Sequence, residues 1–377
     1  MKPKHILLRS SWQSINIGDI AHTPGMLRVL EEFLPQTRVT LWPKEVSPAV
    51  EKMLRARFPR LEWMGNRAPH EVFADCDFML HGSGPGLIGV KEMQLWAKTS
   101  KPYGFGGITL NDEELRDHAD LMRGAKFLFC RDTLSLQAAR EAGIGAQFFP
   151  DATFFLDLKN EDAAEKFLAE KRLEPKNFAC FIPRLRWTPY WIQNPQFYLP
   201  EAIAQKEAEN ARNVELDHAK MREAIVAWVR QTGQKALLCP EMTYEIELLR
   251  PYLFDPLPDD VKPLVELRES YWLTDEAASV YEKASTILSF ECHSPIMAIE
   301  SGTPAIYLRQ PTDTRKGQMY RDIGLGEWIL EIEETSGAQI SRRLLSLLEP
   351  GAAHSIAAAH EFNAARRAEF INALSAL

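Results

Sequence analysis

Short apolar segments alternate with segments of helical periodicity along almost the whole chain. In the first half, the apolar runs cover residues 5–9, 38–42, 78–81, 103–105, 126–130 and 147–149. A strand, a helix and a second strand in strict succession form a right-handed parallel unit. The pattern therefore predicts an α/β domain with a parallel, doubly wound, Rossmann-like sheet.

The same alternation restarts after a charged stretch at residues 157–176 and predicts a second Rossmann-like half. Its apolar runs cover residues 178–182, 236–239, 264–267, 286–290 and 305–308. A chain of 377 residues is long for one hydrophobic core, which also favours two domains. We expect domains over residues 1–165 and 166–345, followed by a helical extension over 346–377.

Several helix starts are marked by capping residues. Thr23-Pro24 and Ser47-Pro48 suit an N-cap followed by the first helical position, and Asn111 with Glu114 forms a capping box. In the second half, a long helix is expected at 214–231. The stretch before it is expected to be an irregular binding loop as far as Glu209, because long structureless insertions in compact domains are often functional.

The composition is that of an ordinary globular protein and excludes some classes of function. The formal net charge of −8 and the pI near 5.7 argue against a nucleic-acid-binding protein. No apolar run approaches the roughly 20 residues of a membrane span, and the N-terminus lacks a signal-peptide pattern. We therefore expect a cytoplasmic protein with reduced, buried cysteines and no transmembrane segment; formation of a homo-oligomer stays open.

Residues 289–309 predict a buried strand, a polar turn, a short helix and a second buried strand. Ser294 and Pro295 suit the N-cap and first position of the helix, and Gly302 suits its end. His293 would then lie at the carboxyl end of a strand, next to backbone N–H groups that favour an anionic ligand. The alternative is a histidine that only satisfies local hydrogen bonds.

Two polar turns follow strands of the first half. In the first turn, Asn16, Gly18 and Asp19 can contact a ligand or cap the next helix, and both interpretations stay open. In the second, Gly82-Ser83-Gly84 lets a backbone approach a ligand closely. Its spacing does not match a dinucleotide fingerprint or a phosphate-binding loop with its lysine.

Cationic and aromatic residues follow other strands. Arg131 suits an ion pair or an anion site, and Arg184 and Arg186 precede an aromatic cluster that suits stacking on sugar rings. The cluster contains Trp187, Tyr190 and Trp191. Three cations after the 305–308 strand form a candidate anion pocket, with solvated surface charge as the alternative. These are Arg309, Arg315 and Lys316.

In their order along the chain, these motifs resemble the polysaccharide pyruvyl transferase family. The resemblance rests on Asn16-x-Gly18-Asp19, Gly82-Ser83-Gly84, Arg131-Asp132-x-x-Ser135, Asp151-Ala-Thr-Phe154, Arg184, His293, Gly302-x-Pro304 and Lys316-Gly317. It implies a GT-B-like pair of Rossmann domains. It also implies transfer of an enolpyruvyl-derived group from phosphoenolpyruvate to hydroxyls of a cell-surface sugar, as in exopolysaccharide or cell-wall biosynthesis.

The resemblance assigns roles to individual residues. His293 would protonate the methylene carbon, Asp19 would act on the sugar side as a base, and Arg184 with Lys316 would bind the anionic donor. Further donor contacts are expected from Arg186, Arg309, Arg315 and Ser294, and acceptor contacts from the aromatic cluster. No cofactor is expected, and no spacing of His, Cys or carboxylate residues indicates a metal.

At one position the chain departs from the family pattern. Glu291 stands where the family usually has arginine, and a carboxylate there repels phosphoenolpyruvate unless nearby arginines compensate. Two alternatives follow. One is a GT-B nucleotide-sugar glycosyltransferase or epimerase, in which Glu300 would hold a ribose and the helix start a diphosphate. The other is a non-catalytic carbohydrate-binding relative.

Overall fold

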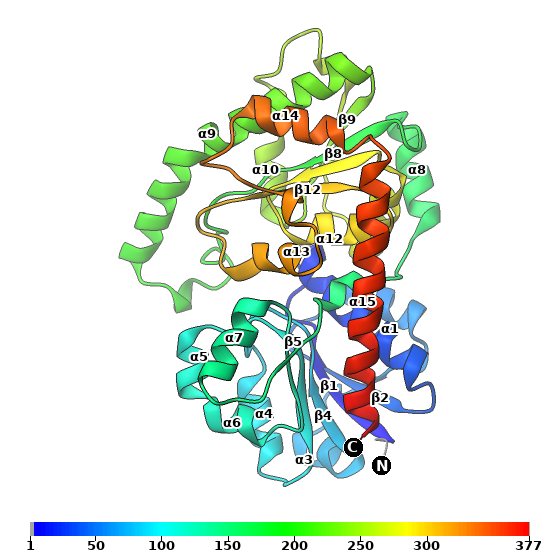
Figure 1. The fold of residues 1–377 in the computed structure, drawn as a ribbon, viewed down its shortest axis with the longest axis vertical. Coiled ribbons are helices and arrows are strands. Elements are labelled where there is room, and N and C mark those ends of the chain that lie inside the picture. Colours follow the sequence, from blue (N-terminus) through cyan, green and yellow to red (C-terminus); the bar gives the residue numbers. More distant parts are fainter. Residues whose placement is uncertain (1–3, 377) are drawn as a thin grey trace. The chain divides into compact units, whose positions relative to one another are not determined.

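The computed structural model describes residues 4–376, which form two compact α/β units (Figure 1). Unit 1 comprises Met1–Leu158, Gln318–Gly326 and Ala357–Leu377. Unit 2 comprises Lys159–Gly317 and Glu327–Ile356. Both contain a parallel sheet with connecting helices, so the predicted fold class is confirmed.

Within the described residues, unit 1 contains a seven-stranded parallel sheet in the order β3-β2-β1-β4-β5-β6-β7. Its strands are β1 (His5–Ser10), β2 (Arg38–Pro43), β3 (Glu62–Trp63), β4 (Phe78–His81), β5 (Tyr103–Ile108), β6 (Leu128–Cys130) and β7 (Gln147–Phe148). Strands β1, β4 and β5 are buried along their whole length, which explains their unbroken apolar runs. The order reverses between β1 and β4, as in a doubly wound sheet.

The helices of unit 1 lie between successive strands, except for the helix at residues 318–322, which belongs to a later segment of the chain. They are α1 (Ile17–Phe33), α2 (Pro48–Arg57), α3 (Pro69–Asp75), α4 (Val90–Ala97), α5 (Asp112–Asp117), α6 (Ala119–Gly124), α7 (Thr133–Glu141) and α13 (Gln318–Asp322). The predicted caps are confirmed for α2, where Ser47 accepts from the Val50 N–H, and for α5, where Asn111 and Glu114 form a capping box.

The predicted start of α1 at Thr23-Pro24 is wrong. The helix begins at Ile17, because the Asn16 side chain accepts hydrogen bonds from the Gly18 and Asp19 N–H groups and caps it there. Pro24 lies inside the helix. Next to it, Gly25 allows close contact with the short 3-10 helix Ala152–Phe155: a Cβ at Gly25 would lie 1.9 Å from the Ala152 carbonyl oxygen.

Within the described residues, unit 2 contains a six-stranded parallel sheet in the order β10-β9-β8-β11-β12-β13. Its strands are β8 (Phe178–Ile182), β9 (Lys235–Leu238), β10 (Val265–Leu267), β11 (Thr286–Ser289), β12 (Ala305–Arg309) and β13 (Ile329–Glu331). The order reverses between β8 and β11, where Ser289 pairs with Ile182. This is again a doubly wound sheet.

The helices of unit 2 are α8 (Glu161–Lys171), α9 (Pro200–Thr232), α10 (Ile246–Leu248), α11 (Thr274–Lys283), α12 (His293–Glu300) and α14 (Gly337–Ser346). The prediction of an irregular stretch up to Glu209 is wrong, because α9 already begins at Pro200. Its first turns are rich in Ala and Glu, which form helix without burial. The chain then ends in α15 (Gly351–Ser375), so the predicted C-terminal helices are present.

The predicted start of α12 is also wrong, by two residues: Cys292 is its N-cap, and His293 is its first residue. Ser294 does not cap the helix with its own side chain. Instead, the Glu241 carboxylate accepts from the Ser294 N–H at 2.6 Å and from the Ser294 hydroxyl at 2.7 Å. A carboxylate from another loop therefore caps this helix.

The last part of the C-terminal helix completes the core of unit 1. Phe370 is fully buried and stacks on Phe149 with ring centroids 4.4 Å apart. Its ring also meets those of Phe129 at 5.2 Å and Phe127 at 5.7 Å. The aromatic cluster thus ties the end of the chain to β6 and to the segment after β7.

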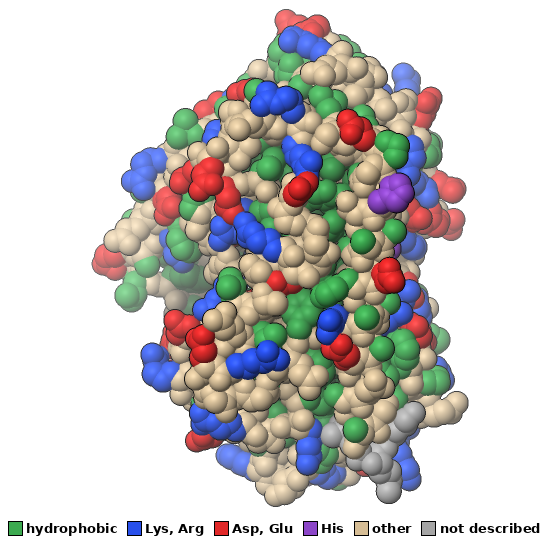
Figure 2. Space-filling model, viewed as in Figure 1, with side chains coloured by type: hydrophobic (Ala, Val, Ile, Leu, Met, Phe, Trp, Pro, Cys, Tyr) green, Lys and Arg blue, Asp and Glu red, His purple; other side chains and the backbone are tan. Residues whose placement is uncertain are grey.

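Charged side chains of both signs are interspersed on the face shown in Figure 2. No extended region of Lys and Arg is visible there, in keeping with the net negative charge. Among the described residues, no helix combines the length and the hydropathy that a membrane crossing requires.

Candidate functional site

Polar side chains gather at the carboxyl ends of the strands that flank each sheet reversal. In unit 1 these are the ends of β1 and β4, which run in register from Ile6 opposite Phe78 to Arg9 opposite His81. In unit 2 they are the ends of β8 and β11. Doubly wound sheets bind ligands at these places, because the chain leaves the two central strands in opposite directions there.

In unit 1, Asp19 lies in the first turn of α1 and is held by two neighbours. Gln13 donates a short hydrogen bond to one carboxylate oxygen, and His22 Nε2 lies 3.8 Å from the other. Asn16, which was predicted to contact a ligand, accepts from the N–H groups of Gly18 and Asp19. Asn16 therefore fixes the helix start that carries Asp19.

A buried chain of polar contacts continues from Asp19 into unit 1. His22 Nδ1 lies 3.0 Å from Asp151, and Asp151 accepts from Arg131 at 2.5 Å. The Arg131 guanidinium also donates to the Thr109 hydroxyl at 2.8 Å. Arg131 thus takes part in an ion pair, the safer of its two predicted interpretations, and His22 is a residue that the sequence-based prediction missed.

The glycine-rich turn after β4 is packed against the turn after β1. A Cβ at Gly84 would lie 2.6 Å from Trp12 Nε1, and one at Gly82 would lie 2.8 Å from the Ser10 hydroxyl. Trp12 donates to the Ser83 carbonyl at 2.6 Å. Close packing within unit 1 is therefore sufficient to require both glycines, and a ligand contact of this turn stays a prediction.

In unit 2, His293 is buried at the first position of α12. Its Nδ1 atom lies 3.4 Å from Glu241 Oε1 and 3.6 Å from the Cys292 sulfur. Burial lowers the pKa of His293, but Cys292 and Glu241 together raise it well above its ordinary value. These two neighbours favour a proton on Nδ1.

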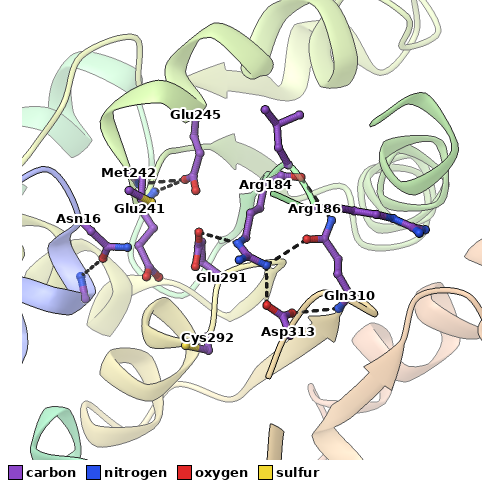
Figure 3. A network of polar contacts seen from close by, with 12 residues as sticks. Asn16, Arg184, Arg186, Glu241, Met242, Glu245, Glu291, Cys292, Gln310 and Asp313 are labelled. Atoms are coloured by element: carbon purple, nitrogen blue, oxygen red, sulfur yellow. Dashed lines mark hydrogen bonds and ion pairs between the residues drawn. The ribbon is translucent and has the colours of Figure 1, made fainter. Parts of the chain in front are cut away.

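Arg184 follows β8 and is surrounded by acceptors (Figure 3). Its Nε lies 2.9 Å from Glu291 Oε1, and its Nη1 donates to Asp313 at 2.6 Å and to the Gln310 amide oxygen at 3.1 Å. Burial lowers the pKa of Arg184, but Asp313 and Glu291 raise it well above its ordinary value. The arginine predicted to bind an anionic donor is thus paired with two carboxylates of its own unit.

Carboxyl groups also support this end of the sheet. Glu245 accepts from the N–H groups of Glu241 and Met242 at 2.7 and 3.0 Å. Burial and the nearby carboxylates of Glu291 and Glu241 raise the pKa of Glu245 well above its ordinary value. These effects favour the protonated form of Glu245, whose side chain fixes the loop carrying Glu241.

Lys316, another of the predicted cations, interacts electrostatically with the carboxylates at this end of the sheet. Burial lowers the pKa of Lys316, but Cys292, Glu291 and Asp313 more than offset that effect and raise it. Arg309, by contrast, pairs with Glu331 at 2.8 Å and donates to the Asp313 carbonyl.

Arg186 is directed to other acidic partners. It pairs with Asp217 of α9 at 2.9 Å and with Glu333 at 2.7 Å. The next residue, Trp187, donates from its indole N–H to Glu209 at 2.6 Å. Both side chains therefore anchor the segment after β8 to α9.

Glu300 is the last residue of α12. With a rise of 1.5 Å per residue, its Cα lies roughly 10 Å along the helix axis from that of His293. A ribose contact from Glu300 would thus come from the far end of the helix. Arg315 lies in the short 3-10 helix Arg315–Gly317, one residue before Lys316.

The structure thus brings His293, Arg184 and Lys316 to one end of the unit 2 sheet and separates Glu300 from them; their roles in binding and catalysis stay predictions. It adds two carboxylates that sequence analysis did not select, Glu241 and Asp313. Glu241 could have been found, because it follows a buried strand at the same edge as His293. Nothing in the sequence indicates that Asp313, within a run noted for its cations, pairs with Arg184.

The two doubly wound units define an α/β protein of the GT-B-like class. UDP-GlcNAc 2-epimerase from Neisseria meningitidis, bound to UDP-GlcNAc, has a TM-score of 0.60 at 10% identity, covering 98% of this chain and 99% of that chain. UDP-GlcNAc 2-epimerase from Methanocaldococcus jannaschii has a TM-score of 0.59 at 13% sequence identity, covering 92% of this chain and 93% of that chain. ADP-heptose lipopolysaccharide heptosyltransferase II from E. coli has a TM-score of 0.53 at 12% sequence identity, covering 92% of this chain and 98% of that chain.

The family is shown by a sequence model rather than by these structures. The model of the polysaccharide pyruvyl transferase family matches residues 16–310. The chain belongs to this family, so the predicted resemblance is confirmed. A search of curated proteins finds no match to this chain.

Proposed function

We propose that this protein is a pyruvyl transferase that joins the enolpyruvyl-derived group of phosphoenolpyruvate to a cell-surface saccharide as a ketal. Family membership supports the reaction class. The buried cysteines of the described chain form no disulfide with one another, which fits a reducing compartment, so we place the reaction in the cytoplasm.

The proposed reaction balances without a cofactor. One sugar hydroxyl adds to C2 of phosphoenolpyruvate, and the methylene carbon takes a proton to become a methyl group. The bond between C2 and the phosphate oxygen breaks, and a second sugar hydroxyl closes the ketal. Of the two hydroxyl protons, one ends on the methyl group, by way of the catalytic groups, and the other on the released phosphate.

The observation that carries the proposal is the contact between His293 Nδ1 and Glu241 Oε1 at 3.4 Å. It stabilises the protonated imidazole, the form from which a general acid delivers its proton. Lys316 supplies positive charge for the phosphate. In unit 1, Asp19 is the proposed base for the sugar hydroxyl.

A second candidate function is favoured by the ion pair of Arg184 with Glu291. A compact trianionic donor is attracted less strongly by an arginine that is already paired with two carboxylates than by an arginine without such partners. A larger nucleotide-sugar donor would not require that guanidinium. The structural neighbours bound to UDP-GlcNAc are consistent with this candidate, although at 10% identity they show the fold alone.

The test is a donor assay on the purified full chain. Phosphoenolpyruvate or UDP-GlcNAc is incubated with a panel of saccharides, and released phosphate or UDP is measured by phosphorus NMR. We expect turnover of phosphoenolpyruvate, and we expect His293→Gln to lower the rate by about 10²–10⁴-fold. Turnover of the nucleotide sugar alone would select the second candidate.

The matched control is His218→Gln. His218 is also a buried histidine of unit 2, but its ring packs against Tyr252 and Phe290, and its Nδ1 contacts the Val214 carbonyl. This variant should keep the wild-type rate per folded molecule. A His293→Gln enzyme that retains most of its activity would remove His293 from the mechanism.

A further inference from the structure

The loop that leads into α9 exposes several large apolar side chains. Seven large apolar residues are exposed in the described part of the chain, and three of them lie within residues 192–199. Ile192 is 68% exposed, Phe197 76% and Leu199 72%. Single exposed apolar residues are common, but a cluster of this kind marks an interaction surface.

The same segment has no charge. Residues 187–200 contain no Asp, Glu, Lys or Arg, whereas a quarter of the whole chain is charged. They contain five aromatic residues and three prolines, at positions 189, 195 and 200. Proline has no backbone N–H, so the segment has fewer donors that would lose water when it is covered.

Contacts with α9 support the loop. Trp191 is buried, its indole N–H donates to Glu207, and its ring packs edge-on against Tyr198 with centroids 6.1 Å apart. The Lys206 ammonium lies 4.6 Å from the Trp187 ring centroid and 5.1 Å from that of Tyr198. These contacts hold the inner aromatic rings on α9 and leave Ile192, Phe197 and Leu199 exposed.

The helix that carries the loop projects from the core of unit 2. Its buried residues begin at Asn210, and none of residues 200–209 is buried. Figure 1 shows this first part of α9 extending beyond the sheet of unit 2. The apolar cluster of Ile192, Phe197 and Leu199 is therefore presented at the end of a projecting helix.

We propose that residues 192–199 insert into the interfacial layer of a lipid bilayer, with Ile192, Phe197 and Leu199 entering the acyl region. Three side chains form a patch of a few hundred Å², well below the roughly 800 Å² that each partner buries in a stable protein–protein interface. A bilayer needs no complementary shape and accepts isolated apolar side chains. Tyr198 and Trp187 lie beside them as amphipathic aromatics suited to the lipid–water boundary.

The charge near the loop indicates which lipid surface it fits. The first turns of α9 carry both signs, with Glu201, Glu207 and Glu209 outnumbering Lys206 and Arg212. This arrangement gives no attraction to an anionic surface. Binding should therefore occur on zwitterionic vesicles and change little with salt, because apolar insertion is not screened by ions.

The test is co-sedimentation of the full chain with vesicles of pure phosphatidylcholine, without substrate. We expect the wild-type chain to pellet with the vesicles at low and high salt. The triple variant Ile192→Ser, Phe197→Ser, Leu199→Ser should lose about tenfold or more of its partitioning, because each replaced side chain removes apolar area. The control variant Leu216→Ser and Leu348→Ser removes two exposed leucines elsewhere in unit 2 and should bind as wild type.

Circular dichroism melting shows that each variant is folded. The proposal is overturned if the wild-type chain does not bind, if the triple variant binds equally well, or if binding needs anionic lipid and disappears with salt. It is also overturned if light scattering finds a dimer that the triple variant lacks while vesicle binding is absent. The assay uses no donor or acceptor, so its outcome does not depend on the proposed reaction.

Discussion

His293 illustrates how one residue type acquires its properties from its neighbours. Burial alone would favour its neutral form, whereas Cys292 and Glu241 raise the pKa of its imidazole well above the ordinary value. A general acid must hold its proton at the working pH, so its rate falls as the pH rises through its pKa. Cys292 and the Glu241 carboxylate together therefore determine how far toward alkaline pH His293 keeps its proton.

Replacing this carboxylate by an amide should move the pH profile. We expect Glu241→Gln to lower the pKa of His293, so that the rate falls at a lower pH on the alkaline side. Activity at acidic pH should be largely kept, because the amide oxygen can still accept from Ser294. The measurement is the rate as a function of pH for both enzymes.

Glu245→Gln is the matched control for this experiment. Its carboxyl group is buried in the same loop, but its pKa is raised well above the ordinary value, so an amide replaces a group whose neutral form is favoured. The alkaline limb should stay in place in this variant. Equal shifts in both variants would mean that the Glu241 effect is structural.

At the scale of elements, the sequence predicted most strands and missed where two functional helices begin. The strand β8 was predicted with the observed limits, because its buried residues form an unbroken apolar run. The starts of α1 and α12 were misplaced, since Thr23-Pro24 and Ser294-Pro295 match the local capping pattern. The actual caps depend on Asn16 for α1 and on Glu241, about 50 residues away, for α12.

The cap of α1 gives a prediction on stability. Asn16→Ala should cost about 1–2 kcal/mol, because the N–H groups of Gly18 and Asp19 lose their acceptor in a buried place. The exposed cap of α5 is the comparison: Asn111→Ala should cost roughly 0.5–1 kcal/mol. Hydrogen exchange of the α1 and α5 amides measures both losses; a larger loss at Asn111 would contradict the assignment.

For the whole molecule, two doubly wound units could be predicted from the sequence. Which later segments of the chain belong to unit 1 could not be predicted. Alternation of strand and helix is a local property, so it is visible in the sequence. The assignment of residues 318–326 and 357–377 to unit 1 depends on packing far along the chain. The pairing of Arg184 with Asp313 was hidden for the same reason.

The end of the chain gives a prediction at this scale. Phe370→Ala should destabilise unit 1 by about 3–5 kcal/mol, because it leaves a cavity among Phe127, Phe129 and Phe149. Hydrogen exchange should increase across β5 and β6 and change little in unit 2. Phe362→Ala, at a half-buried position of the same helix, should have a clearly smaller effect, and equal losses would argue against a core role for Phe370.

The placement of Phe370 also bears on how the protein is made. A domain emerging from the ribosome generally folds before the next one is synthesised. Here the first unit lacks part of its interior until the helix that carries Phe370 has been synthesised, because its aromatic cluster needs that side chain. All of the second unit precedes this residue in the chain, so the N-terminal half exposes part of its apolar interior until after the second unit has been synthesised.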